Sequence, residues 1–256
     1  MMFYSLSLIL IMYGFSRLPH WIGFLFLVSG IFILVVFILF EQNVKFPLFE
    51  MDLFKKNKTF AFSNLAALIN YSATFAVGFL LSLYLQYIKG LDPGAAGLVL
   101  VSQPVVMAVF SPITGRLSDK IEPRIVASLG MSLSAIGLFL FLFLKSTTPL
   151  PLIIINLVFI GLGFALFSSP NTNAIMSSVD KKHYGVASGS VGTMRMVGQM
   201  FSMGIALLLF SIFLGKNEIL PENYHSFLSA MHVAFIIFTI LCFSGIFASL
   251  ARGKLR

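Results

Sequence analysis

Long apolar segments alternate with short polar ones along the whole chain. Eight segments stand out, at residues 1–16, 21–40, 60–88, 93–114, 125–144, 150–178, 184–214 and 226–250. All but the first reach the roughly 18 residues that a membrane-spanning helix needs. Residues 138–144 alternate Leu and Phe without a polar face, so these helices are apolar all round rather than amphipathic. The pattern predicts an all-α polytopic membrane protein with about eight transmembrane helices.

The first segment has a second interpretation. A secretory signal also begins with a short apolar stretch, but such a signal carries a basic start and a cleavage site of small residues. Residues 1–16 carry neither feature, and another apolar segment follows at once. We therefore interpret residues 1–16 as a transmembrane helix, and a secretory signal remains the alternative.

The longest polar connection divides the predicted helices into two and six. We expect two transmembrane helices in residues 1–41, a cytoplasmic linker in 42–59, a six-helix bundle in 60–251 and a basic cytoplasmic tail in 252–256. Leu-Phe pairs within residues 47–56 are typical of an amphipathic segment that lies on the membrane surface. A plain tether explains the same residues equally well.

Composition supports the membrane assignment. The chain is 58% hydrophobic and only 10% charged, whereas soluble domains are about a quarter charged. The single cysteine, Cys242, excludes an intrachain disulfide and indicates no metal cluster. We expect no cofactor.

The net charge of +8 is distributed unevenly about the predicted helices. If residues 115–124 are cytoplasmic and each helix crosses the bilayer, most basic residues fall inside: Lys45, Lys55, Lys56, Lys58, Arg116, Lys120, Arg124, Lys181, Lys182, Arg252, Lys254 and Arg256. Far fewer fall outside: Arg17, Lys89, Lys145 and Lys216. This bias predicts that both termini are cytoplasmic in a cell membrane. It also accounts for the basic excess without a nucleic-acid partner.

Five charges gather in the segment Gly-Arg-Leu-Ser-Asp-Lys-Ile-Glu-Pro-Arg at residues 115–124. This segment resembles the signature loop of the major facilitator superfamily, which joins the second and third helices of a six-helix bundle. Here it joins the second and third helices after the linker. Glu122 stands where the family has its second loop glycine.

Further segments resemble the fourteen-helix drug:proton antiporter branch of that superfamily. They are residues 47–60, residues 84–90 with Pro93 and Gly97, residues 161–163 with Pro170, and residues 185–189 with Arg195. The resemblance implies a multidrug efflux permease that exchanges a small amphipathic molecule for protons. Members of this branch carry six helices before the central pair, so the chain resembles their C-terminal portion. Its implied partners are the lipid bilayer and a missing N-terminal six-helix bundle or a second copy.

Acidic residues are absent from the interior of every predicted span; all nine lie in connections or at helix ends. Proton coupling usually uses an ionisable residue within the membrane, so a coupling carboxylate would come from the missing bundle. The spans also lack paired carboxylates, a zinc-binding His-Glu-x-x-His motif and a Ser-His pair. Nothing here favours an enzyme.

Arg195 is the charged residue that lies well inside a predicted span. It is 11 residues from Tyr184, about 16 Å along an α-helix. Ser188, Gly192, Gln199 and Ser202 place a polar stripe around it. Arg195 and Gln199 are therefore candidates for the substrate path or for a charge partner. The alternative is that Arg195 extends to lipid headgroups.

Other polar residues within spans have two interpretations as well. Asn70, Thr74, Gly78, Ser82 and Gln86 follow one another at intervals of four. They either line a substrate path or hydrogen-bond between packed helices. Gln103 beside Pro104 indicates a helix kink with a polar side chain.

Glycines and a histidine are more readily explained by packing. Gly185, Gly189, Gly192 and Gly198 fit close helix contacts between small residues. His232, in the last span, is expected to be a packed or hydrogen-bonded side chain.

The charged segment also suggests a conformational latch. In this hypothesis Asp119 accepts backbone N–H groups at a helix start, and the basic residues pair with helix carbonyl ends. Its residues are Gly115, Arg116, Asp119, Lys120 and Arg124. The alternative is that these charges only set topology. At the level of the whole chain, a half-transporter, a truncated inactive fragment and a non-transporting membrane scaffold all remain open.

Overall fold

The computed structural model describes residues 2–18, 20–41, 51–215 and 219–253. This part of the chain is helical and contains no strand. Its elements are α1 (Met2–Ser16), α2 (Trp21–Glu41), α3 (Met51–Lys56), α4 (Lys58–Thr74), α5 (Ala76–Leu83), the π-helical turn η1 (Tyr84–Ile88), α6 (Pro93–Leu100), α7 (Ser102–Lys120), α8 (Pro123–Leu140), η2 (Phe141–Phe143), α9 (Leu150–Ser177), η3 (Lys181–His183), α10 (Tyr184–Phe213), η4 (Pro221–Asn223) and α11 (Tyr224–Ala251).

Six helical segments are long and apolar enough to cross a membrane, among the residues that the structure describes. Their bounds are Lys58–Ile88, Pro93–Lys120, Pro123–Phe143, Leu150–Ser177, Lys181–Phe213 and Pro221–Ala251. The shorter apolar helices α1 and α2 precede them. The predicted class, an all-α polytopic membrane protein, is therefore confirmed.

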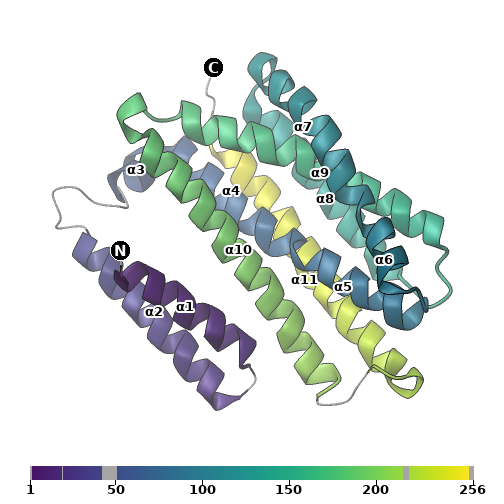
Figure 1. Cartoon of the computed structure of the whole chain (residues 1–256). Helices are drawn as coiled ribbons and strands as arrows, with labels where there is room; N and C mark the ends of the chain where they lie inside the picture. The colour runs from purple at the N-terminus through teal and green to yellow at the C-terminus, as the bar shows by residue number, and fades with distance from the viewer. Residues whose placement is uncertain (1, 19, 42–50, 216–218, 254–256) are drawn as a thin grey trace.

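The six spans form one bundle, and α1 and α2 form a separate hairpin beside it (Figure 1). α4, α5 and α11 lie in the middle of the bundle, while α10 and the α6–α7 segment lie on either side of them. The hairpin lies next to α10, where the Tyr4 hydroxyl is 2.7 Å from the Thr193 hydroxyl. The start of α4 lies against the end of α11, where the Thr59 hydroxyl donates to the Arg252 carbonyl at 2.8 Å.

The expected linker is only partly described. Residues 42–50 lie outside the described residues, and the rest form α3 and the start of α4. Leu53 and Phe54 of α3 pack against a buried cluster at the end of the bundle, where the Phe54 and Phe60 rings meet edge to face at 4.8 Å. Within the described part of residues 47–56, the apolar side chains Leu53 and Phe54 thus contact protein.

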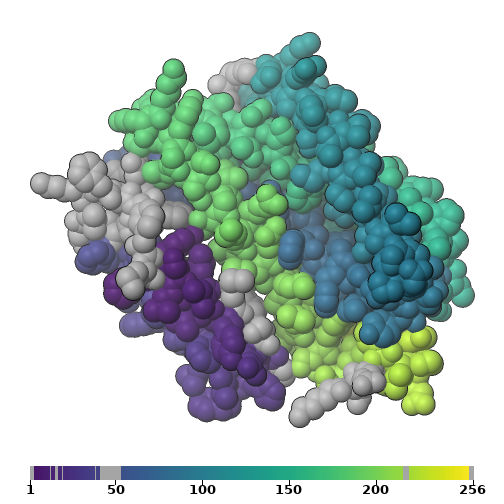
Figure 2. All heavy atoms as spheres, in the orientation of Figure 1, coloured from purple at the N-terminus to yellow at the C-terminus, as the bar shows by residue number. Residues whose placement is uncertain are grey.

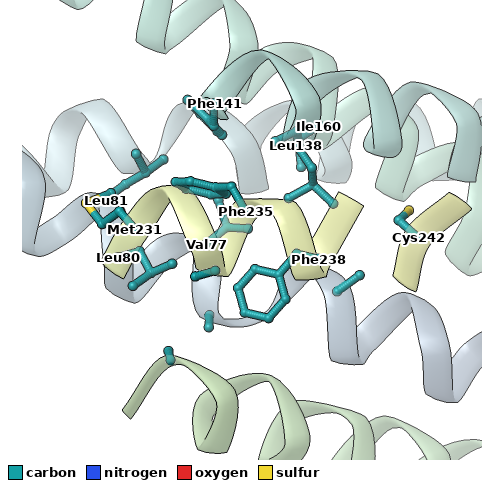
Figure 3. Packing of buried hydrophobic residues seen from close by; sticks show 14 of the residues in the cluster. Val77, Leu80, Leu81, Leu138, Phe141, Ile160, Met231, Phe235, Phe238 and Cys242 are labelled. Carbon is teal, nitrogen blue, oxygen red and sulfur yellow. The ribbon is translucent and has the colours of Figure 1, made fainter. Parts of the chain in front are cut away.

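The apolar core lies between α5, α8, α9 and α11. Figure 3 shows Phe235 and Phe238 of α11 among side chains of these helices. The Phe141 and Phe235 rings are 5.2 Å apart. Cys242 is buried in the same core, where its thiol donates to the Met131 carbonyl at 3.3 Å.

Two glycines let α8 and α9 cross with their backbones in contact. A Cβ atom on Gly130 would lie 2.6 Å from the Gly163 carbonyl oxygen, and one on Gly163 would lie 2.8 Å from the Gly130 oxygen. Close backbone approach through small residues is the usual way in which membrane helices pack without large side chains.

Within the described residues, one of the four α10 glycines makes the predicted close helix contact. Gly198 does make a close crossing with α4, but a Cβ atom on Gly185, Gly189 or Gly192 would meet nothing within 4 Å. The reason is geometric: α10 packs through the face that contains Ala187, Ser190 and Gly198, and the other three glycines are on a different face.

The signature segment is more helical than a loop. α7 continues to Lys120 and α8 begins at Pro123, so only two residues of 115–124 separate the helices. The charges mark where the apolar run stops, whereas helical hydrogen bonding continues past that point.

The second span of the bundle has the kink that Gln103 and Pro104 predict, because it is interrupted at Val101, between α6 and α7. Proline lacks the N–H that would bond four residues back.

Candidate functional site

The first membrane span of the bundle loses one bond of its helical ladder near its middle, while Phe75 keeps helical dihedral angles (φ −66°, ψ −45°) and donates to the Tyr71 carbonyl; we call this position the α4–α5 break. α4 ends at Thr74 and α5 begins at Ala76, with 17 residues of the 31-residue span before Phe75 and 13 after it. No proline or glycine accounts for the break. Instead, the Ala76 backbone N–H donates to the Ser202 hydroxyl of α10 at 2.9 Å. A side chain inserted into the helical hydrogen-bond ladder is a known cause of such interruptions.

α10 crosses the span close to this break. A Cβ atom on Gly198 would lie 2.7 Å from the Leu68 carbonyl oxygen and 2.8 Å from the Tyr71 Cβ atom. Gly198 and Ser202 are four residues apart and therefore share a face of α10. The crossing thus brings α10 into backbone contact with α4 one turn before the interruption.

Arg195 lies on α10 one turn before the crossing. It is the fifteenth residue of the 33-residue span Lys181–Phe213, near the middle. Its guanidinium carbon lies 5.7 Å from the centroid of the Tyr71 ring, within the range of a cation–π contact. Tyr71 is buried and meets Phe164 of α9 edge to face at 5.5 Å. The aromatic pair holds the cation against α4 at mid-span.

The surface of α10 around Arg195 differs from the apolar surface that α11 exposes. Its exposed residues between Gly185 and Met196 are mainly glycine and serine, with Arg195 at one end. On α11, in contrast, the exposed stripe is bulky and apolar, as at Ile240, Phe243 and Phe247. A charged side chain facing hydrocarbon is costly. We therefore infer that protein or water covers this face of α10.

Figure 2 shows the same face of the molecule with its side chains. α10 and the α6–α7 segment form its two sides, and residues of the α4–α5 segment are visible between them. The broken span thus lies between α10 and α6–α7 on this face. We call the surface formed by Gly185, Ser188, Gly189, Gly192, Arg195, Met196 and Gln199 the α10 polar face.

The predicted polar stripe of the first span divides into two parts. Asn70 and Thr74 are buried, and the Thr74 hydroxyl donates to the Asn70 carbonyl at 2.8 Å. Both polar side-chain atoms of Asn70 are buried without a hydrogen-bond partner. Gln86 is half-buried and donates to the Ser82 hydroxyl at 2.9 Å. The stripe turns around the helix because four residues exceed one turn of 3.6.

Gln199 and Gln103 lie on different sides of the site. Gln199 is half-buried, next to Gly198 at the crossing. Gln103 is half-buried on α7, where its backbone packs against α9: a Cβ atom on Gly161 would lie 2.6 Å from the Gln103 carbonyl oxygen. The structure therefore brings Arg195, Gln199 and the α4 break together, and places Gln103 at the α7–α9 crossing.

A second polar cluster closes one end of the bundle around Arg252. Arg252 is only 1% exposed and is the largest fully buried side chain of the described residues. It donates to the Asn171 side-chain oxygen at 2.9 Å, to the Ser63 hydroxyl at 3.2 Å and to the Ser249 carbonyl at 2.8 Å. A further short bond reaches the Ser249 hydroxyl. The cluster ties α4, α9 and α11 together.

Arg252 keeps its charge at neutral pH although its surroundings disfavour the charged form. Burial lowers the pKa of the guanidinium from 12.5 to about 10, and the nearby Glu122 partly opposes this shift. Arg252 therefore remains charged at neutral pH. A cation is also favoured beside the carbonyl groups at a helix C-terminus. The sequence placed Arg252 in the exposed basic tail, and the structure instead buries it.

The residues of the signature segment lie at the same end of the bundle. Arg116, Asp119 and Lys120 are exposed, whereas Gly115 and Arg124 are half-buried. Next to them, the Asn173 side-chain amide donates to the Ser118 hydroxyl at 2.9 Å, which ties α7 to α9. The Ser128 hydroxyl donates to the Arg124 carbonyl at 2.6 Å and contacts the Ser249 hydroxyl at 2.8 Å. The segment is therefore continuous with the Arg252 cluster.

Sequence reasoning missed the role of two residues in these clusters and one contact of a third. Tyr71 was missed because an aromatic residue within an apolar span carries no signal of its own. Ser202 was placed on the polar stripe, but its bond to Ala76 is a contact between distant segments. Arg252 is the first charge after the last span, a position that suits a tail or a helix cap.

The prediction for His232 is confirmed. It was expected to be packed or hydrogen-bonded, and its Nε2 atom is 2.8 Å from the Leu144 carbonyl oxygen.

The fold and the site together define a class of protein. A bundle of six spans carries a mid-span cation and a polar face that lipid does not suit. These are features of a membrane transporter, because charged residues within membrane spans usually face a bundle interior or a water-filled path.

The chain belongs to the major facilitator superfamily. The family model described as "Major Facilitator Superfamily" matches residues 64–254. This supports a multi-pass membrane transporter rather than an enzyme.

Known transporters are similar over most of the chain. The riboflavin transporter RibZ of Clostridioides difficile is 33% identical over 223 residues, which is 85% of this chain and 48% of RibZ. The transporter YebQ of Escherichia coli is 28% identical over 227 residues, 89% of this chain and 47% of YebQ. The methyl viologen resistance protein SmvA of Salmonella typhimurium is 24% identical over 204 residues, 79% of this chain and 40% of SmvA. The chain spans about half the length of the first two relatives.

Proposed function

We propose that this chain is the C-terminal portion of a fourteen-helix drug:proton antiporter in the plasma membrane. It works with an N-terminal six-helix bundle or with a second copy, and both of its termini are cytoplasmic. It exports drugs or other small amphipathic molecules. The relatives support this range, because one is a riboflavin transporter and others are named for multidrug or methyl viologen resistance.

The observation that carries the proposal is the exposed mid-span position of Arg195 on the α10 polar face. Hydrocarbon next to this face would meet a guanidinium and exposed helix backbone, which is unfavourable. A second bundle facing α10 would cover the face and leave a polar path between the two bundles. Transport then takes place at an interface of which this chain forms one wall.

Proton coupling requires a group that the described spans do not supply. Within the described residues, no Asp or Glu lies in the interior of a span. We assign the coupling carboxylate to the facing bundle. Asn70, Thr74, Gln86, Gln103 and Gln199 are then candidates for polar contacts along the substrate path.

The charged end of the bundle is proposed to act as a latch. Gly115, Arg116, Asp119, Lys120 and Arg124 lie where α7 and α8 meet, beside the Arg252 cluster. Contacts from these charges to helix ends of the facing bundle would hold one arrangement and separate in the other. Such switching requires two arrangements in which the same charges have different contacts.

A flux measurement tests the proposal. The chain is reconstituted into vesicles alone and with an N-terminal six-helix bundle of the same superfamily supplied as a second chain, and gradient-driven movement of riboflavin and of dyes of both charge signs is followed. We expect flux with the second bundle present, and a loss of about tenfold or more in Arg195→Gln because a mid-span charge is removed. Arg17→Gln serves as the matched control, since Arg17 also lies over a tyrosine ring, 5.2 Å from the Tyr13 centroid, but on the hairpin.

Arg17→Gln should leave the flux unchanged. Gradient-independent leakage alone, in every combination of chain, bundle and substrate, would contradict the proposal. It would instead favour the truncated inactive fragment or the non-transporting scaffold.

A further inference from the structure

We propose that the α10 polar face selects planar aromatic anions, and that Arg195 binds their anionic group. This inference deepens the proposed function, on which it rests, by naming the substrate class of the same site.

The charge on the face has one sign. Among the described residues, Arg195 has no carboxylate within ion-pair distance, and the acidic side chains of the bundle lie at helix ends or in connections. A cation near mid-span is stabilised when an anion approaches it and is destabilised by a second cation. The neutral side chains of Ser188 and Gln199 do not offset this preference. An anionic ligand is therefore favoured over a cationic one of the same shape.

The aromatic support favours a flat ligand group. The guanidinium of Arg195 is planar and lies over the Tyr71 ring, which Phe164 contacts edge to face. A guanidinium can stack with one planar group while its N–H groups bind a carboxylate in two parallel hydrogen bonds. Because Tyr71 is buried and contacts Phe164, it holds the guanidinium of Arg195 against α4 and limits its movement towards water.

The shape of the face leaves room for such a ligand. Gly185, Gly189 and Gly192 are exposed, and a Cβ atom on any of them would have open space for 4 Å. They lie on the same side of α10 as Arg195, at spacings of three or four residues. Without side chains, this part of the helix is flat, so an aromatic ring can lie directly on the backbone with its acidic group towards Arg195.

A matched set of ligands tests the inference by binding alone. Purified chain in phosphatidylcholine nanodiscs is dialysed to equilibrium against 2-naphthoate, 2-naphthamide and 2-naphthylmethylammonium, with empty nanodiscs subtracted. The three share one ring system and differ in charge. We expect naphthoate to bind about tenfold more tightly than the ammonium, with the amide between them.

Variants assign the preference to the face. Arg195→Gln should remove the difference between the three ligands, Arg195→Lys should keep its sign with weaker naphthoate binding, and Arg17→Gln should match the unchanged protein. Gly192→Leu should weaken naphthoate binding severalfold, because a side chain would then occupy the flat surface.

Several results would overturn the inference. They are equal affinity for the three ligands, tighter binding of the ammonium, no binding of any of them at millimolar concentration, or a preference that survives in Arg195→Gln. The inference and the proposed function fail separately. Flux without an anion preference removes only the substrate class, and an anion preference without flux removes only the transport activity.

Discussion

Gly130→Ala is expected to destabilise the protein more than any other single added methyl group. The new Cβ atom would lie 2.6 Å from both the Gly163 carbonyl oxygen and the Phe167 nitrogen, and 2.8 Å from the Leu166 carbonyl carbon. All three are backbone atoms of α9, so no side chain can turn away to make room. Overpacking of a close-packed interior costs about 1–3 kcal/mol even when side chains can adjust. We therefore expect a loss of about 3 kcal/mol or more.

Thermal unfolding in detergent measures this effect. For a chain of this size, about 3 kcal/mol corresponds to a drop in the unfolding midpoint on the order of 10 °C. Gly192→Ala is the matched control, because its Cβ atom would have open space. Alanine is favoured over glycine within a helix by about 1 kcal/mol, so this variant should be equally or slightly more stable. Equal midpoints for the two variants would contradict the α8–α9 crossing described above.

Arg252→Ala is expected to produce the second large loss of stability. The variant removes every bond that the guanidinium makes to α4, α9 and the end of α11, and it leaves the Asn171 oxygen buried. Hydrogen bonds to a charged group contribute about 1.5–3 kcal/mol each before the cost of burying the charge is counted. A net loss of roughly 3 kcal/mol follows, because the desolvation of Arg252 offsets part of the total.

Two further variants separate bonding from packing. Arg252→Met keeps much of the buried volume and should recover part of the loss, while the Asn171 oxygen stays without its donor. Arg116→Ala removes an exposed arginine at the same end of the bundle and should change stability by less than about 0.5 kcal/mol. If Arg252→Ala unfolds at the same temperature as Arg116→Ala, the cluster does not hold the helices together.

The membrane spans could be predicted from sequence because the bilayer imposes a length and a composition on them. Each of the six bundle spans coincides with a predicted apolar segment. The helix ends were less accurate, and residues 115–120 show why. Charge there marks the limit of the apolar layer, but backbone hydrogen bonding continues to Lys120. Polarity and helicity are separate properties, and composition indicates only polarity.

The details of the site depended on contacts that sequence does not specify. The break at Phe75 arises from a hydroxyl on another helix, and nothing in residues 70–80 indicates it. The glycines of α10 illustrate the same limit. Gly198 packs against α4 while Gly192 faces open space, although the sequence gives both the same small-residue surroundings. The position of Arg195 was anticipated because a charge within an apolar span is conspicuous.

The central claim is that the α10 polar face lines a water-accessible path rather than meeting lipid, and cysteine labelling tests it most directly. In a Cys242→Ala background, Gly192→Cys and Phe243→Cys are compared in native membranes with a water-soluble maleimide. Both positions are exposed, one on the α10 polar face and one on the apolar stripe of α11. Thiols react as thiolates, which require water. We predict labelling at least about tenfold faster at position 192. Equal rates, or faster labelling at 243, would show that the Arg195 face meets lipid and would contradict the account.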